Sequence, residues 1–134
     1  MRKLILAIIA ACALVIFLWF FFGYPKYQDM RLRKKLFTRS DYPQIAAACV
    51  KLANSVTNDG TPLLPSDPVV PPILRSLKPR EIMYYSNYVR LDFGGEGRYT
   101  YDVQQSDTNP KLWTLDIGAP EQFGSQSLTT ITNN

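Results

Sequence analysis

The chain contains no histidine and has two cysteines among its 134 residues. Without histidine, a catalytic triad of the Ser-His-Asp kind and the usual histidine-bearing zinc sites are excluded. Cys12 lies in a long apolar run and Cys49 in a predicted helix of the following domain, so no disulfide framework or cysteine-based metal site is expected. We therefore expect no cofactor, no metal site and no catalytic residue, and the sequence predicts a protein that is not an enzyme.

Charge, glycine and proline are all absent from the run between Leu4 and Phe22. At about 1.5 Å per residue, a helix of this length is just long enough to cross the ~30 Å hydrocarbon core of a bilayer. We therefore predict a single-pass transmembrane anchor over residues 1–23, with the lipid bilayer as a partner. Aromatic and basic residues near its end are expected at the membrane interface: Trp19, Tyr24, Lys26, Tyr27, Arg31, Arg33, Lys34 and Lys35.

Two further interpretations of the N-terminus compete with an anchor. A cleaved signal peptide has a shorter apolar region followed by a small-x-small site, whereas this run ends in Trp-Phe-Phe-Phe. A lipoprotein signal is suggested by the sequence Ile-Ala-Ala-Cys ending at Cys12, but further apolar residues continue to Phe22. The uncleaved anchor fits the pattern best. A mass spectrum showing a mature chain without its first two dozen residues would contradict it.

Positive charge is concentrated beside the apolar run. The chain has a formal net charge of +4, but residues 1–39 carry eight Lys and Arg against one acid, whereas residues 40–134 carry seven against ten acids. The folded part is therefore mildly acidic, which argues against nucleic acid as a partner. The basic neck at residues 24–39 is either a flank that fixes topology or a collar that docks on anionic headgroups. By the positive-inside rule, the basic neck favours a C-terminal domain on the cytoplasmic side. A Met-Arg-Lys start before an apolar run is also typical of exported segments, which favours the opposite side.

Residues 40–134 form a small domain that we predict to be of the α+β class. Ser40 or Asp41 is a suitable helix cap, and Pro43 is tolerated in a first turn. The predicted helix spans residues 42–56, and its apolar stripe consists of Ile45, Cys49, Leu52 and Val56. A proline-rich connector follows at residues 61–79, with one short helical turn over residues 73–77.

Apolar residues alternate with polar ones over residues 81–117. This period of two predicts a four-stranded antiparallel β-meander with one apolar face, which the helix covers. The expected strands run from Glu81 to Tyr85, Tyr88 to Phe93, Arg98 to Val103 and Leu112 to Ile117. Gly94-Gly95-Glu96-Gly97 is expected to be a turn rather than a phosphate loop, because it joins two strands. In the polar tail at 118–134, Phe123, Leu128 and Ile131 are expected either to tuck against the domain or to add an edge strand, with the end frayed.

The polar face of this sheet is the predicted partner surface. Tyrosine is favoured in interfaces, and the candidate contact residues are Tyr85, Tyr88, Arg90 and Arg98. Asp92, Asp102 and Asp116 lie on the same predicted face. Paired carboxylates are able to do acid–base chemistry or bind a cation, but their alternation with arginine and threonine is typical of cross-strand pairing on a wet face.

One resemblance bears on the class of protein. The stretch from Pro71 to Pro79, followed by a strand pair and Gly94-Gly95, resembles small bacterial membrane-anchored proteins of uncharacterised families. The resemblance covers about a third of the chain and implies a bacterial inner-membrane location with no assigned activity. The order of an apolar helix and then a sheet is similar to that of pilin-like proteins, but their leader Gly-Phe junction is missing here.

These observations together predict a membrane-anchored, non-enzymatic accessory or interaction protein that presents a small α+β domain to a protein partner. A second hypothesis is a small single-pass subunit that packs laterally in a larger membrane complex through its phenylalanines, Phe17, Phe20, Phe21 and Phe22. A pilin-like or exported protein is a third, and an enzyme that uses the carboxylates of the sheet is a fourth.

Overall fold

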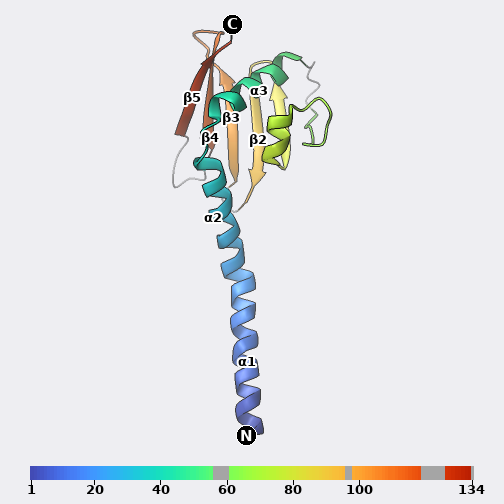
Figure 1. The fold of residues 1–134 in the computed structure, drawn as a ribbon, viewed down its shortest axis with the longest axis vertical. Coiled ribbons are helices and arrows are strands. Elements are labelled where there is room, and N and C mark those ends of the chain that lie inside the picture. Colours follow the sequence, from blue (N-terminus) through green and yellow to red (C-terminus); the bar gives the residue numbers. More distant parts are fainter. Residues whose placement is uncertain (56–60, 96–97, 119–125, 134) are drawn as a thin grey trace. The chain divides into compact units, whose positions relative to one another are not determined.

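The computed structural model describes residues 1–55, 61–95, 98–118 and 126–133. The chain divides into two compact units, Met1–Thr38 and Arg39–Asn134. Figure 1 shows that the first consists of helix alone, whereas the second combines helices with a sheet. The α+β class predicted from the sequence is confirmed.

The first unit is helical from Arg2 to Phe37, and the helix comprises α1 (Arg2–Leu18), a π-helical turn (Trp19–Gly23) and α2 (Tyr24–Phe37). The N–H of Tyr24 donates to the carbonyl of Trp19, five residues back. Pro25 lacks a backbone N–H, and the wider turn lies immediately before it, which lets the helix continue through a proline. Gly23 allows the indole of Trp19 to lie against the backbone, because a Cβ there would come 2.6 Å from the indole Cε3.

The second unit contains two helices and a five-stranded antiparallel sheet in the order β1-β2-β3-β4-β5. The helices are α3 (Tyr42–Ser55) and α4 (Pro72–Leu77), and the strands are β1 (Glu81–Tyr85), β2 (Tyr88–Gly94), β3 (Tyr99–Gln105), β4 (Leu112–Gly118) and β5 (Gln126–Thr132). The sheet has one strand more than the predicted four-stranded meander, and of the two alternatives left open for the tail the structure has the edge strand. The fifth comes from the polar tail, where β-branched Thr and Ile residues pair along the free edge of β4.

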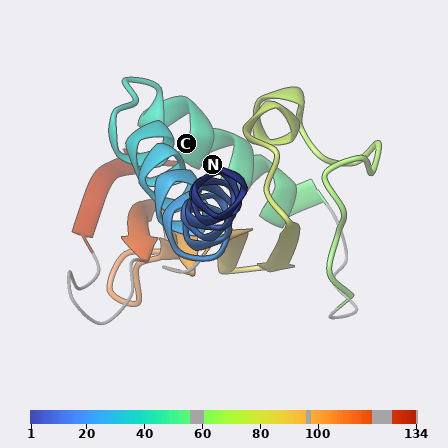
Figure 2. The ribbon, with the colours of Figure 1, turned by 90° about the horizontal axis from the view of Figure 1, so that it is seen from below.

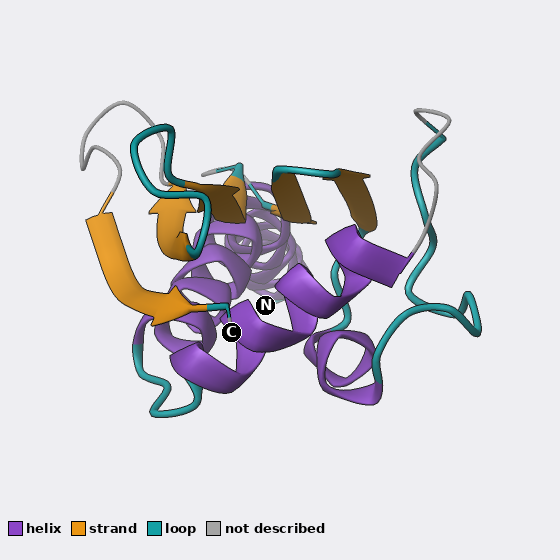
Figure 3. Ribbon diagram, turned by 90° about the horizontal axis from the view of Figure 1, so that it is seen from above, coloured by secondary structure: helices purple, strands orange, loops and turns teal. Residues whose placement is uncertain are grey.

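Both helices lie on one side of the sheet (Figures 2 and 3). The residues of α3 that the sequence places on one stripe, Ile45, Cys49 and Leu52, are buried. They face the alternate residues of the strands, which are also buried: Ile82, Tyr84, Val89, Leu91, Tyr99, Tyr101, Val103, Trp113, Leu115 and Ile117. The predicted packing of helix on sheet is therefore confirmed, while Val56 of the predicted helix lies outside the described residues.

The proline-rich connector covers one edge of the sheet. Leu63 exchanges two backbone hydrogen bonds with Ile82 of β1, at 2.8 and 2.9 Å. The predicted short helical turn is α4, whose Leu74 and Leu77 are buried. It ends at Lys78, which has a left-handed backbone with φ of 54°. The bridge at Leu63 satisfies edge groups that would otherwise be open to pairing with another chain.

The predicted glycine turn between β2 and β3 is described in part, because residues 96–97 lie outside the described ranges. Gly94 and Gly95 have positive φ values of 65° and 82°, as expected for glycines in a turn. Arg98 also has a positive φ, of 47°, and β3 begins one residue later than predicted and extends to Gln105. A left-handed arginine belongs to the turn rather than to the strand, which explains the shifted boundary.

Gly118 at the end of β4 faces Thr100 of β3. A Cβ at this glycine would collide with the Thr100 hydroxyl oxygen and lie 3.5 Å from a carboxylate oxygen of Asp102. We expect Gly118→Ala to lower the free energy of unfolding by about 1–3 kcal/mol, which is typical of overpacking. Urea denaturation measures the loss, and in a Thr100→Ala background the same substitution should cost less. An equal cost in both backgrounds would contradict this explanation.

Candidate functional site

The face of the sheet opposite α3 carries the predicted partner surface. We call it the outer face and define it by the strand residues that alternate with the buried ones: Glu81, Met83, Tyr85, Tyr88, Arg90, Asp92, Thr100, Asp102, Gln104, Thr114 and Asp116. Pairing across the strands arranges them in rows. Tyr85, Tyr88 and Gln104 share one row, and Arg90, Asp102 and Asp116 share the next.

Asp102 is the centre of the hydrogen bonding on this face. Its Oδ1 accepts from the Tyr88 hydroxyl at 2.9 Å and from Arg90 Nε at 2.7 Å. Its Oδ2 accepts from Arg90 Nη2 at 3.3 Å and from the Thr100 hydroxyl at 3.2 Å. The expected cross-strand pairing of arginine with aspartate is therefore present. Because both carboxylate oxygens already accept hydrogen bonds, Asp102 positions its neighbours.

Tyr88 is held in place by this network. The Arg90 guanidinium lies 5.6 Å from the centroid of its ring, and the ring of Tyr85 lies 6.3 Å away. Burial raises the pKa of the Tyr88 hydroxyl to about 12, and the hydrogen bond to Asp102 acts in the same direction. The hydroxyl therefore stays protonated at neutral pH and serves as a donor. Tyr85 is 42% exposed, so an aromatic surface remains accessible beside a fixed one.

Three of the four predicted contact residues lie together, and the fourth does not. Tyr85, Tyr88 and Arg90 occupy adjacent rows. Arg98 precedes β3, at the end where Tyr99 pairs with Gly94, which is the opposite end of the strands from Tyr85. The structure thus provides a compact surface around Tyr88, with Arg98 away from it.

The remaining carboxylates on the face have different surroundings. Asp92 Oδ1 accepts from the N–H of Gly94 at 2.7 Å and so supports the following turn. Asp116 lies directly across from Asp102 in the strand register. Within the described ranges, no group of three or more His, Cys, Asp or Glu side chains has the arrangement of a metal site.

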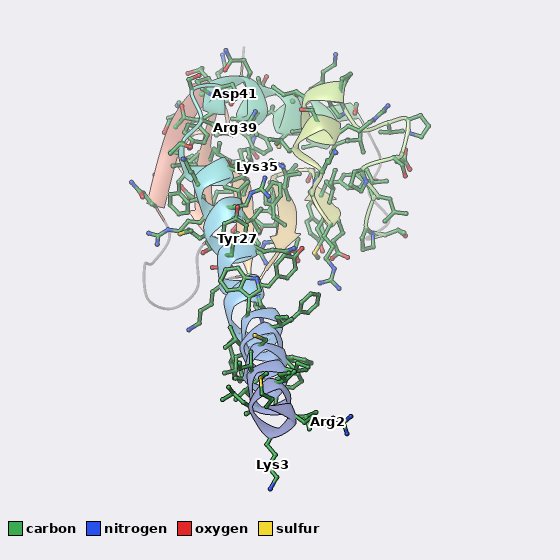
Figure 4. All side chains as sticks on the ribbon, turned by 60° about the horizontal axis from the view of Figure 1, so that its bottom comes forward. Arg2, Lys3, Tyr27, Lys35, Arg39 and Asp41 are labelled. Atoms are coloured by element: carbon green, nitrogen blue, oxygen red, sulfur yellow. The ribbon has the colours of Figure 1, made fainter. Side chains whose placement is uncertain are left out.

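The predicted membrane-interface residues all belong to the π-helical turn and α2. Trp19, Tyr24 and Tyr27 are exposed, and the Arg31 guanidinium lies 5.9 Å from the centroid of the Tyr27 ring. Figure 4 labels Tyr27 and Lys35 on this helix, with Arg2 and Lys3 at its N-terminal end. By length and composition, one helix near the N-terminus, Arg2–Phe37, is able to cross a membrane, a test that a signal sequence also passes.

Two features are not evident from the sequence, one on the outer face and one at the start of the second unit. From the alternating pattern, Asp102 is expected to be an acid on the solvent-exposed face, but its role in fixing Tyr88 is not. The one sequence feature that indicates this role is the position of Asp102 across from Arg90 in the predicted hairpin. Arg39 and Asp41 form an ion pair at 2.8 Å at the start of the second unit (Figure 4). The hydrogen bond from Arg39 lowers the pKa of the Asp41 carboxyl. Such a pair at a spacing of two residues has no periodic signature.

The raised pKa of Tyr88 has a consequence at high pH. An unfolded tyrosine ionises near pH 10 and Tyr88 in the folded protein near pH 12, so the free energy of unfolding should fall between these values. Burial also raises the pKa of Tyr101 and Cys49, which adds to the same trend. In Tyr88→Phe the fall should be shallower, as measured by urea denaturation from pH 9 to pH 12. Tyr85→Phe is the matched control, and an identical slope in Tyr88→Phe and wild type would contradict the assignment.

Comparisons of the chain with family models, curated protein sequences and solved structures found no match.

Proposed function

We propose that the chain is a membrane-anchored, non-enzymatic interaction protein, whose α+β domain binds a protein partner through the outer face. The observation that carries the anchor is the exposure of the apolar helix. All residues from 1 to 22 are exposed, including large side chains such as Phe20 at 65% and Ile9 at 59%. A continuous apolar surface of this extent requires a non-aqueous environment.

The proposed span implies which residues lie near the membrane surface. If the hydrocarbon core ends near Phe22, Tyr24, Lys26 and Tyr27 lie within about 8 Å of its edge, in the headgroup layer. Arg31 lies about 13 Å beyond that edge and Lys35 about 20 Å, at the usual rise per residue. A helix perpendicular to the membrane therefore keeps this basic cluster in water, where it acts as a topological flank. Direct docking on headgroups requires a tilted helix.

The outer face has the features of a binding surface. Tyr88 is fixed by Asp102 and Arg90, so little side-chain entropy remains to be lost when a partner binds. The neighbouring Tyr85 is exposed and aromatic, and tyrosine and arginine are the residue types that dominate interface energies.

Photo-crosslinking in native membranes tests the proposal. A photoreactive residue replacing Tyr85 should capture one defined partner, whereas the same residue at Lys51 on the exposed side of α3 should not. The capture should disappear in Tyr88→Ala, which removes the fixed ring. Equal capture from both positions, or capture that is indifferent to Tyr88, would overturn the proposed surface.

The hypothesis of a lateral subunit makes a different prediction. Its contact would lie on the aromatic half of the helix, where the rings of Phe17 and Phe21 lie 4.4 Å apart between centroids and are tilted by 36°. A photoreactive residue at Phe20 would then capture the partner, and a domain variant such as Tyr88→Ala would have no effect. This pair of outcomes separates the two candidates.

A further inference from the structure

Negative charge is concentrated on the outer face. Four of the ten acids after residue 40 lie there, Glu81, Asp92, Asp102 and Asp116, together with a single base, Arg90. The remaining bases of the domain lie elsewhere: Lys51 on α3, Arg75 on α4, Lys78 at its end, and Arg80, Arg98 and Lys111 just before strands. The outer face therefore carries a net charge of −3.

This charge is not neutralised by ion pairs within the described chain. Arg90 pairs with Asp102 at 2.7 Å. No ion pair joins Glu81, Asp92 or Asp116 to another described residue. Asp116 lies across from Asp102, whose charge Arg90 already balances, so the carboxylate of Asp116 is the one in this cross-strand pair that has no ion pair among the described residues. The fold therefore leaves a position where an external cation lowers the electrostatic energy.

The aromatic part of the face is suited to the same kind of ligand. The Arg90 guanidinium already lies over the ring of Tyr88, which shows that the tyrosine surface accommodates a planar cation. Tyr85, in the next position of the same row, is exposed and open to a second one. Tyr85 and Asp116 are three strands apart and two residues apart along the strands, a separation of about 16 Å from standard sheet spacings. An extended peptide covers this distance in about five residues.

We infer that the partner segment bound by the outer face is basic: an extended stretch of protein whose arginine or lysine side chains reach Tyr85 and Asp116. This inference rests on the proposed function and specifies the chemical character of the partner. It also excludes anionic headgroups as ligands of this face, because like charges repel.

Titration of the full chain in nanodiscs of zwitterionic phosphatidylcholine tests the inference. The probe is a fluorescent twelve-residue Gly/Ser peptide with arginines five residues apart. A comparison peptide carries glutamates at the same positions. The arginine peptide should bind and the glutamate peptide should not. Glu81→Gln with Asp116→Asn removes the Asp116 contact and one further negative charge of the face, and it should weaken binding about fivefold. Tyr85→Ala should weaken it about threefold, in line with one cation–π contact.

The matched control removes two charges elsewhere. Asp67→Asn with Asp107→Asn makes the same change in net charge on loops outside the outer face. If this control weakens binding as much as the outer-face pair, or if both peptides bind equally, the inference is wrong. Tyr85 is exposed, so Tyr85→Ala keeps the test valid if the charge variants unfold. If position 85 crosslinks to a partner but the arginine peptide does not bind, only the inference of a basic partner is wrong. If position 85 does not crosslink and the arginine peptide does not bind, the proposed function is wrong as well.

Discussion

Replacing Ala11 and Leu14 by aspartate should release the chain from the membrane. Both residues lie near the middle of the apolar run and are exposed on α1. A charged residue at the centre of a spanning helix costs about 2.5–3.5 kcal/mol, whereas each Leu, Ile, Phe or Val contributes only about −0.3 to −0.6 kcal/mol. Two aspartates therefore offset most of the favourable free energy of insertion. We expect the double variant to move from the membrane pellet to the soluble or aggregated fraction.

Alkaline carbonate extraction followed by centrifugation measures this change. The control variant, Ala11→Leu with Leu14→Ile, alters the same positions without adding charge and should stay in the pellet. Intact-mass measurement of the wild-type chain accompanies the experiment. A wild-type protein that is extracted by carbonate, or that lacks its first two dozen residues, would show that the apolar helix is a signal sequence.

The inner and outer faces of the sheet were predictable because β-strands alternate strictly. In β2 the buried residues are Val89 and Leu91, as the period of two requires, and the polar residues between them lie on the outer face. The two-residue connection at Ser86-Asn87 fixes the register of β1 against β2, with Tyr85 opposite Tyr88. The burial of Tyr84 and exposure of Tyr85 follow from the same alternation.

The fifth strand could not be decided from the sequence because its signal is weak. Thr129, Thr130 and Thr132 are neither clearly apolar nor clearly polar, so the alternation is faint. The strand forms because β4 offers a free edge, which is a property of the assembled sheet. A bulge also shifts its register, since Leu115 pairs with Thr129 while Asp116 pairs with Ser127. No local pattern specifies such a shift.

The interaction surface was predicted in part for a related reason. Tyr85, Tyr88 and Arg90 are close in sequence and remain close in the hairpin. Asp102 and Gly118 join them only through the pairing of β3 with β2 and β4, so their roles depend on long-range register. Arg98 follows the turn between β2 and β3, so its place in the chain puts it at the opposite end of the strands from Tyr85. Its left-handed backbone, which the sequence does not indicate, also removes it from β3.

Tyr101 connects the helical layer to the sheet, and truncating it should greatly reduce the stability of the domain. Its side chain is fully buried at the centre of β3, and its ring makes edge contacts with Tyr42 at 6.2 Å and Phe93 at 5.1 Å between centroids. Replacing a buried aromatic residue by alanine costs about 3–5 kcal/mol. A domain of this size has a free energy of unfolding of about 5–15 kcal/mol in total, so Tyr101→Ala should lose roughly a fifth or more of it.

Urea denaturation in nonionic detergent measures this loss, in a Trp19→Phe background that leaves Trp113 as the single reporter. Trp113 is buried in the same core, so its fluorescence follows unfolding of the domain. Tyr101→Phe keeps both ring contacts and should cost about 1 kcal/mol, the usual value for one hydrogen-bonding group. Tyr42→Ala removes one of the two ring contacts, so its loss of unfolding free energy should lie between those of Tyr101→Phe and Tyr101→Ala. If Tyr101→Ala costs no more than Tyr101→Phe, the ring does not hold α3 against the sheet, and the outer face loses the rigid support that preorganised binding at Tyr88 requires.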